Sequence, residues 1–379
     1  MRYLLKHCHL IVDGNREYLD GALLINNDII EELYYQSNKI PEIEDEYEII
    51  DLDGRVVMPG FFDTHCHGGN LISFDTCSKE EMDTLSYEFS KDGTTSYLAS
   101  LSYDLGFDQM NNQLKLFEDY QSGYSRFQGF HLEGPFLNRK HLGMGDADKF
   151  VDPDIEKIKE FISNSSRIRQ VTIAYELDGA KQIGKLLHEN GIRVMCGHSD
   201  AVYADLDENV DGFTHLFNAM RSLHHRDITL VNCAFMNRWY VEVIADGHHI
   251  DENVLRLVLN NIDRNLIMLI SDSSIARNLP DGDYIFISKL CHKEGTIFKS
   301  YDGHFAGSVV SINDEMKVLR RLGAKYTDLL KYSSLNAFRF YGLDNKYGTL
   351  DKGKYADIVI MDDDLNIDNV YVKGRFINA

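Results

Sequence analysis

The sequence is poor in proline and has no paired cysteines. Only five prolines and no Ser/Gly-rich linker occur in 379 residues, which argues against domains on flexible tethers and favours one compact unit. The six cysteines are scattered and form no Cys-x-x-Cys pair, a pattern typical of reduced thiols. We therefore predict a cytoplasmic protein without disulfide bonds.

Long apolar runs and an excess of positive charge are also absent. No stretch approaches the ~20 apolar residues of a membrane helix, and the N-terminus lacks the uninterrupted apolar core of a signal peptide. Lys+Arg 39 against Asp+Glu 60 gives a net charge of −21, which disfavours nucleic acid and anionic membranes as partners. We expect a soluble protein, in which a phosphorylated ligand would need a local cationic pocket.

Strand-like runs alternate with helical stretches through the middle of the chain, as in βα units. Helix signals include Asp-Pro-Asp at 152–154, with an Asp cap and Pro at the first position, and Asp251. Both ends of the chain carry short strands, and neither end can bury a core alone. The predicted fold class is α/β, a (β/α)8 TIM-like barrel over 58–345 with a small β-sandwich domain built from 1–57 and 346–379.

Five of the eight apolar runs end in a side chain able to bind a metal. The runs at 56–62, 129–132, 193–196, 212–214 and 266–270 lead into His65 with His67, Glu133, His198, His215 and Asp272, respectively. His65 and His67 point to one face, because residues i and i+2 of a strand do so. Strand C-termini are where a (β/α)8 barrel assembles its chemistry. The sequence therefore predicts a metal centre.

The ligand types fit zinc or iron, for which imidazoles and carboxylates are common donors. Four imidazoles and two carboxylates suit either one ion with spare groups or two ions bridged by a carboxylate. A bound divalent metal lowers the pKa of its water from ~15.7 towards ~7, and Asp272 is our candidate to accept and return the proton. Metal-assisted hydrolysis of a C–N bond is the chemistry this set favours.

Several motifs carry a resemblance to a known family. The run from Pro59 to His67, PGFFDTHCH, resembles the opening signature of the amidohydrolase superfamily. Further segments, in order to the C-terminus, resemble the N-acetylglucosamine-6-phosphate deacetylases: HLEGPFLN at 131–138, GHS at 197–199, THLFNAM at 214–220, ADGHH at 245–249, LPDG at 279–282 and FAGS at 305–308.

The resemblance implies a metal-dependent deacetylase of N-acetylglucosamine-6-phosphate, or of a closely related amino-sugar phosphate. It implies that Glu133, His198 and His215 are the principal ligands, that His65 and His67 serve a second ion, and that Asp272 is the acid/base at the metal. The implied substrate-binding residues are Asn218, Ala219, Arg226, His249 and Phe305. Members lend the arginine to a neighbouring subunit, which implies a homodimer.

Three departures from the family pattern fall on loops expected to touch substrate. Gly145 stands where the family has His or Gln, Arg221-Ser222 replaces Pro-Pro, and 273–278 replaces an Ala-rich run. Arg221 and Arg277 are therefore candidates to contact an anionic ligand. We expect the reaction class to be kept and leave the sugar epimer open.

Two other functions remain to be weighed. The first is another amidohydrolase, such as a deaminase or a cyclic-amide hydrolase. The cyclic-amide members often use a lysine from the fourth strand to bridge two metals. That strand ends here in Ala174-Tyr175-Glu176, without a lysine, which argues against them. A barrel that has lost catalysis and acts as a binding protein is the other. All proposed ligands and Asp272 are present, so we rank it last.

Overall fold

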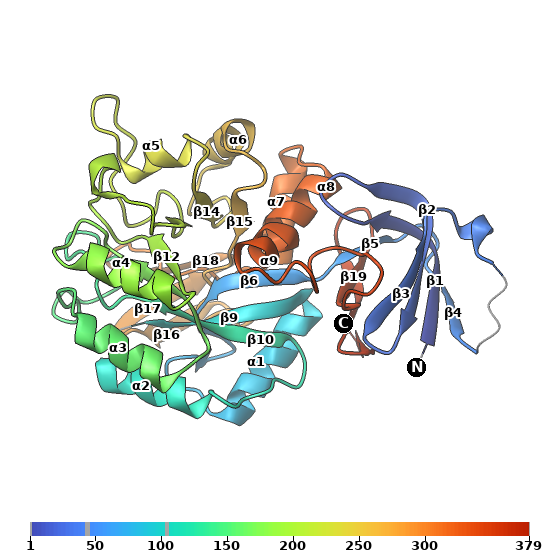
Figure 1. Cartoon of the computed structure of the whole chain (residues 1–379), viewed down its shortest axis with the longest axis horizontal. Coiled ribbons are helices and arrows are strands. Elements are labelled where there is room, and N and C mark those ends of the chain that lie inside the picture. The colour runs from blue at the N-terminus through green and yellow to red at the C-terminus, as the bar shows by residue number, and fades with distance from the viewer. Residues whose placement is uncertain (1, 42–45, 103–105, 379) are drawn as a thin grey trace.

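The computed structural model describes residues 2–41, 46–102 and 106–378. Two bodies lie side by side in it (Figure 1). The larger one holds most of the helices around a parallel sheet, and the smaller one is a sheet that contains strands from both ends of the chain. No described helix is both long and apolar enough to cross a membrane.

The larger body is a barrel of eight parallel strands in chain order. Backbone hydrogen bonds from Asp272 N to His65 O (2.8 Å) and from His67 N to Ser273 O (2.7 Å) join its first and last strands. The predicted (β/α)8 fold with a β domain from both termini is confirmed. Its strands are β6 (Phe61–Cys66), β9 (Thr94–Ser102), β10 (Arg126–Glu133), β11 (Ile168–Ile173), β12 (Arg193–Cys196), β13 (Gly212–Phe213), β14 (Tyr240–Val243) and β15 (Ile267–Leu269).

Helices cover the outside of this barrel and bury their apolar side against it. Asp154 and Asp251 cap α3 and α6 through their side chains, so Pro153 lies one residue before the cap and not at the first helical position. The helices are α1 (Lys79–Lys91), α2 (Phe107–Leu116), α3 (Ile155–Asn164), α4 (Ala180–Glu189), α5 (Leu230–Ala234), α6 (Glu252–Asn261), α7 (Ile312–Arg321), α8 (Tyr326–Leu330) and α9 (Asn336–Phe340).

The smaller body is an eight-stranded sheet in which β5 is paired with β1 and β19. The run at 56–62, interpreted from sequence as one strand, is divided: its first part is β5 in this sheet, and β6 of the barrel starts after Gly60. The strands are β1 (Arg2–Ile11), β2 (Glu17–Asn26), β3 (Ile29–Tyr34), β4 (Glu48–Asp51), β5 (Val56–Pro59), β19 (Ile358–Met361), β20 (Ile367–Val372) and β21 (Arg375–Asn378).

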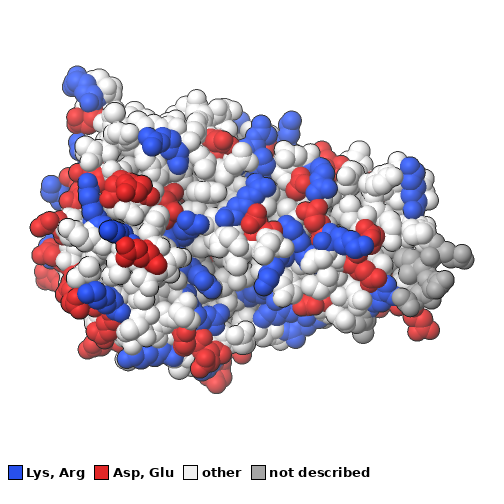
Figure 2. Space-filling view, in the orientation of Figure 1, with Lys and Arg blue, Asp and Glu red and all other residues white. Residues whose placement is uncertain are grey.

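A partly buried ion pair ties the two bodies together. Arg126 at the start of β10 contacts Asp357 just before β19, with its Nε 2.5 Å from Oδ2, and its guanidinium lies 4.3 Å from the ring centroid of Tyr355. Elsewhere on the surface, acidic and basic residues are interspersed over the face drawn in Figure 2.

Two small sheets lie near the C-terminal mouth of the barrel. One is the pair β7 (Gly68–Gly69) and β8 (Ile72–Ser73), which follows directly on β6. The other is an antiparallel sheet of three strands, β16 (Gly282–Phe286), β17 (Lys289–Glu294) and β18 (Ile297–Ser300). Sequence patterns alone did not indicate this second sheet.

Candidate metal centre and active site

The candidate ligands meet at the C-terminal mouth of the barrel, each at or just after a strand end. His65 lies in the last part of β6 and His67 directly after it, Glu133 ends β10, and the others follow β12, β13 and β15. His198, His215 and Asp272 have φ values of 45°, 30° and 47°. Left-handed backbone costs a non-glycine residue about 1–3 kcal/mol and concentrates at functional sites. At these three residues the left-handed backbone turns the chain at the strand end, so that the side chain points to the other candidate ligands.

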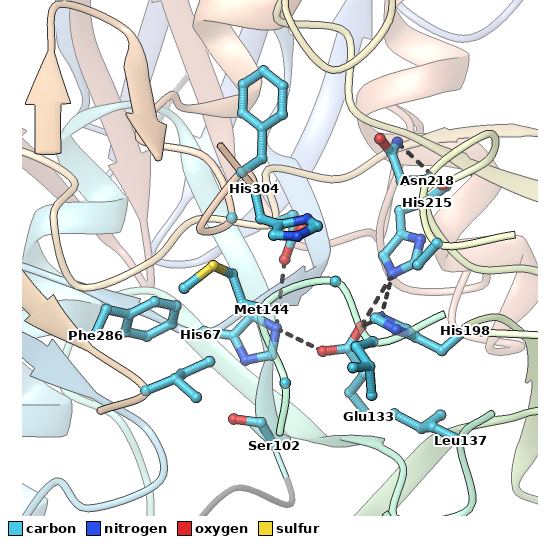
Figure 3. Close-up of a pocket in the computed structure, with 18 of the residues that line it drawn as sticks. His67, Ser102, Glu133, Leu137, Met144, His198, His215, Asn218, Phe286 and His304 are labelled. Atoms are coloured by element: carbon cyan, nitrogen blue, oxygen red, sulfur yellow. Dashed lines mark hydrogen bonds and ion pairs between the residues drawn. The ribbon is translucent and has the colours of Figure 1, made fainter. Parts of the chain in front are cut away.

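Glu133 lies at the middle of the cluster, and Figure 3 shows it between His67 on one side and His198 and His215 on the other. On one side, His67 Nε2 lies 3.2 Å from Glu133 Oε2 and 3.2 Å from His65 Nε2. On the other, His198 Nε2 and His215 Nε2 each lie 3.2 Å from Glu133 Oε1 and 3.1 Å from one another. Two potential three-residue metal sites, His65–His67–Glu133 and Glu133–His198–His215, therefore share one carboxylate.

Asp272 adjoins the first of these groups. Its Oδ1 lies 3.5 Å from His65 Nε2 and 3.4 Å from His67 Nε2. Burial would raise the pKa of Asp272, but the charge of His65 and a hydrogen bond from His67 hold that pKa below its usual value. Burial would also raise the pKa of Glu133, but the charge of His65 and hydrogen bonds from the other three imidazoles outweigh it and hold that pKa well below its usual value. The imidazoles of the cluster therefore favour the ionised form of both carboxylates.

The donor set fits a divalent cation. Imidazole nitrogens face one another at 3.1–3.2 Å in both groups, and all four rings turn Nε2 towards Glu133, at 3.2–3.6 Å from its oxygens. The opposite ring nitrogens, Nδ1 of His67 and of His215, are buried without a hydrogen-bond partner in the described part of the chain. Nitrogen and carboxylate donors that converge in this way are typical of zinc and iron sites.

The cluster forms the floor of a cavity of about 290 Å³. Apolar side chains make much of its wall, chiefly Leu137, Met144, Phe150, Phe286 and Phe305. These side chains limit the access of water to the cluster, which strengthens electrostatic interactions inside.

Most of the residues expected to bind substrate line this cavity. Asn218, Ala219, His249 and Phe305 do so, and the His249 ring lies 4.2 Å from the Phe305 ring. Asp246 Oδ2 accepts a hydrogen bond from His249 Nδ1 at 2.7 Å, which leaves Nε2 of that imidazole as its other hydrogen-bonding atom.

Two arginines considered for substrate binding are not among the residues that line the cavity. Arg226 is exposed on the segment between β13 and α5 and is not among the residues lining the cavity. Arg277, a candidate to contact an anionic ligand, is only 1% exposed and pairs instead with Asp92 at the end of α1. That expectation for Arg277 is wrong, because its charge is used inside the protein.

Gly145 lines the cavity and has no room for a side chain. A Cβ atom at this position would lie 2.7 Å from Cζ of Phe150, whose ring is T-shaped against His198 at 6.5 Å. An aromatic ring therefore takes the space next to Gly145.

Other residues of the site escaped the sequence analysis. Ser102 and His304 line the cavity with their polar side chains, and Phe286 reaches it from the three-stranded sheet. Glu242 is fully buried on β14 and lies 3.3 Å from His65 Nδ1. The available signal for Glu242 was a lone carboxylate inside the apolar run 239–244.

Residues 56–377 match the model of the Amidohydrolase family. The chain is 32% identical over 332 residues to the N-acetylglucosamine-6-phosphate deacetylase of Lysinibacillus sphaericus, covering 85% of each protein. It is 28% identical over 337 residues to the N-acetylgalactosamine-6-phosphate deacetylase of Escherichia coli O157:H7, covering 86% of this chain and 89% of that protein.

Solved structures are similar over the whole length. N-acetylglucosamine-6-phosphate deacetylase from Pasteurella multocida has a TM-score of 0.93 at 23% identity, with 100% of both chains covered. A mutant of the enzyme from Mycobacterium smegmatis, in complex with N-acetyl-D-glucosamine-6-phosphate, has a TM-score of 0.91 at 25% identity, with 100% of both chains covered.

Proposed function

The chain belongs to the amidohydrolase family, in the group of the N-acetylglucosamine-6-phosphate deacetylases, and we propose that it hydrolyses the acetamide of N-acetylglucosamine-6-phosphate to acetate and the free amine. The observation that carries the proposal is the cluster itself. Two groups of imidazoles share Glu133, and Asp272 adjoins one of them, on the floor of a cavity.

The proposed metal ligands are His65, His67, Glu133, His198, His215 and Asp272. One or two ions, zinc or iron, held there would polarise the acetyl carbonyl and lower the pKa of a water molecule. Asp272 is the proposed catalytic acid/base, and its ionised state suits the first step, in which it takes a proton from the attacking water. It then returns this proton to the nitrogen of the leaving amine, because an amide nitrogen leaves poorly without one.

The proposed substrate site has a polar end and an apolar wall. We assign Asn218, the backbone of Ala219 and the His249 imidazole to the sugar phosphate, and the Phe305 ring to packing. Among the described residues that line the cavity there is no lysine or arginine, although a phosphate binds best through charge-assisted hydrogen bonds. The missing positive charge is supplied, in this proposal, by Arg226 of a second copy of the chain in a homodimer.

The segment that carries Arg226 has the composition of an interface. Leu223 and Ile228 are 53% and 43% exposed on it, and exposed apolar side chains that cluster are common at contacts between proteins. A cytoplasmic location is also proposed, since all six cysteines are free and buried, as suits a reducing compartment.

The other functions have less support. Glu176, after the fourth strand, accepts hydrogen bonds from Asn138, Ser199 and the backbone of Asp200, so it is engaged away from the bridging position of a cyclic-amide hydrolase. The specific alternative is a different epimer. A relative at 28% identity is named for the galacto sugar, and Gly145 adds no polar side chain that would select between hydroxyl orientations.

The test is free-amine and acetate release by metal-replete protein from four substrates. These are N-acetylglucosamine-6-phosphate, its galacto and manno epimers, and the unphosphorylated gluco sugar. We expect fast release from the gluco phosphate and at least ten-fold slower release from the others, a difference of about 1.4 kcal/mol in transition-state binding. Preference for another epimer would change the assigned substrate but keep the reaction. No release from any of the four would contradict the proposed function.

A further inference from the structure

The four histidines of the cluster are supported unequally at the ring nitrogen that faces away from the ligands. His198 Nδ1 donates to the carbonyl of His141 at 2.7 Å. His67 and His215 have no partner at Nδ1 within the described ranges. His65 alone faces a charged group, since its Nδ1 lies 3.3 Å from Oε2 of Glu242. The two proposed metal sites therefore differ in what holds their ligands.

Glu242 is part of a buried row of hydrogen bonds beneath the cluster. Its other oxygen, Oε1, accepts from Gln170 Nε2 at 2.8 Å, and Gln170 Oε1 accepts from the hydroxyl of Tyr341 at 2.5 Å. Glu242 on β14 and Gln170 on β11 are both fully buried, and Tyr341 directly follows α9. We call Tyr341, Gln170 and Glu242 the Glu242 network.

The direction of every hydrogen bond in the Glu242 network is fixed by the carboxylate. A carboxylate only accepts, so Gln170 must turn its NH2 towards Glu242 and its oxygen towards Tyr341, which then donates. For the same reason His65 must carry its proton on Nδ1. In the neutral ring that binds a metal, Nε2 is then left with a free lone pair, and this is the atom that faces His67, Glu133 and Asp272.

We propose that the Glu242 network fixes the tautomer of His65 and thereby holds a metal ion at His65, His67 and Glu133, whereas an ion at Glu133, His198 and His215 does not depend on it. This inference rests on the proposed metal-dependent function. Glu242 acts here as a positioning residue: a carboxylate behind a ligand histidine orients the ring and makes it a stronger donor.

The first test is Glu242→Gln, which keeps the shape of the side chain but replaces a group that only accepts hydrogen bonds by one that both donates and accepts. With the carboxylate gone, the row no longer fixes the tautomer of His65. If Gln170 still donates, the new amide turns its NH2 to His65, so Nδ1 must accept and the proton lies on Nε2, where it blocks the metal. If Gln170 turns over, the ring keeps its proton on Nδ1 but loses the negative charge behind it, so both arrangements weaken the site. We expect one ion to bind as in the unmutated protein and the other to bind about 10–100-fold more weakly, measured by elemental analysis and by zinc titration against a competing chelator.

The second test is rescue by the double variant Glu242→Gln/Gln170→Glu. The new carboxylate at 170 accepts from both Tyr341 and the amide at 242, so the amide turns its oxygen back to His65. The proton returns to Nδ1, so Nε2 is again free to bind the metal. We therefore expect the weakened site to regain zinc affinity to within a few-fold of the unmutated protein. A merely structural role for Glu242 predicts no such rescue.

The matched control is Glu315→Gln. Glu315 is also a fully buried glutamate, and its Oε1 accepts from the backbone of Ala245 at 2.9 Å, but it contacts none of the four histidines. This variant should bind both ions as the unmutated protein does. A readout that needs no variant is nitrogen NMR of the zinc-loaded protein, in which His65 should be protonated at Nδ1.

Several results would overturn the inference. They are unchanged binding of both ions in Glu242→Gln, equal loss of both ions, no rescue in the double variant, or an unprotonated His65 Nδ1 in the NMR spectrum. An unmutated protein that binds only one ion would also overturn it while leaving acetamide hydrolysis intact. Conversely, two ions with the predicted losses but no amine release would overturn the proposed function and support the Glu242 network.

Discussion

Three of the proposed ligands, His198, His215 and Asp272, hold their side chains in place through left-handed backbone. Each follows a short strand of the barrel, and the turn redirects the chain from the strand axis into the mouth of the barrel. A backbone of this kind persists only where the surrounding structure over-determines it. At Asp272 two backbone bonds do so, from its N–H to His65 O and from Ser308 N–H to its own carbonyl.

Asp272 gives the prediction that belongs to the residue scale. Asp272→Asn removes the group that moves the proton but leaves Glu133 and four imidazoles for the metal. We expect the metal content of the unmutated protein and a kcat lowered by about 10²–10⁴-fold, the usual contribution of general acid–base catalysis. Amine release and elemental analysis on the same sample check both. Retained turnover would move the acid/base role to another side chain.

The convergence of the proposed ligands could be predicted from sequence, but the residues that support them could not. His65, His67, Glu133, His198, His215 and Asp272 all stand at strand ends, and the barrel brings strand ends together whatever the details of packing. Glu242 and Gln170 lie within strands that are far apart in the chain. Their contact depends on the register of the closed barrel, about which local patterns carry no information.

At the scale of elements, the segment that follows β15 is anchored to α1 by Arg277. This side chain contacts the carboxylate of Asp92 at the end of the helix, and its guanidinium lies 4.9 Å from the Phe89 ring centroid. Burial would lower the pKa of Arg277, but Asp92 and Asp63 raise it, so the charge is kept in the interior. The anchor holds the segment that begins with Asp272.

We predict that Arg277→Met destabilises the fold by about 3 kcal/mol. Breaking a buried ion pair costs about 3–5 kcal/mol because the remaining charge is left uncompensated, and the low end applies since the Asp92 side chain is still 22% exposed. Urea unfolding measures the change. Arg321→Met is the control: its pair with Glu252 is exposed, and such pairs contribute about 0–1 kcal/mol. Equal effects of the two substitutions would contradict the anchor.

The sheet β16–β18 is the element that sequence patterns missed. Its strands are half exposed, with Ile285 72% and Leu290 51% exposed, so the alternation that marks a half-buried strand is weak. The sheet nevertheless brings Phe286 to the cavity wall. The motifs at its two ends, 279–282 and 305–308, were recognised by their resemblance to the family.

At the scale of the whole molecule, the proposed phosphate site is complete only when two copies of the chain associate. Arg226 is exposed and away from the cavity of its own subunit, and the described residues that line the cavity include no arginine or lysine. Arg226→Ala should therefore raise KM for the phosphorylated substrate by about 10–100-fold, as expected for loss of a charge-assisted contact of about 1.5–3 kcal/mol. Hydrolysis of the unphosphorylated sugar should not change.

Mixing subunits tests whether the arginine is shared. Co-expressed Arg226→Ala and Asp272→Asn subunits form mixed dimers in which one site has both Asp272 and the partner's Arg226. Such dimers should recover low-KM activity that neither variant has alone. Arg221→Ala, on the same segment but paired with Asp227, is the control and should leave KM for the phosphate within a few-fold. A monomer in sedimentation experiments, or no recovery on mixing, would contradict the homodimer.

The central claim is that the cluster around Glu133 is a metal centre that hydrolyses an acetamide, and its most direct test is activity against metal content. Metal-free protein should release no amine from N-acetylglucosamine-6-phosphate. Release should rise in proportion as zinc or ferrous iron is added, and should level off when the cluster is filled at one or two ions per subunit. Release that is independent of bound metal, or absent at full loading, would contradict the account.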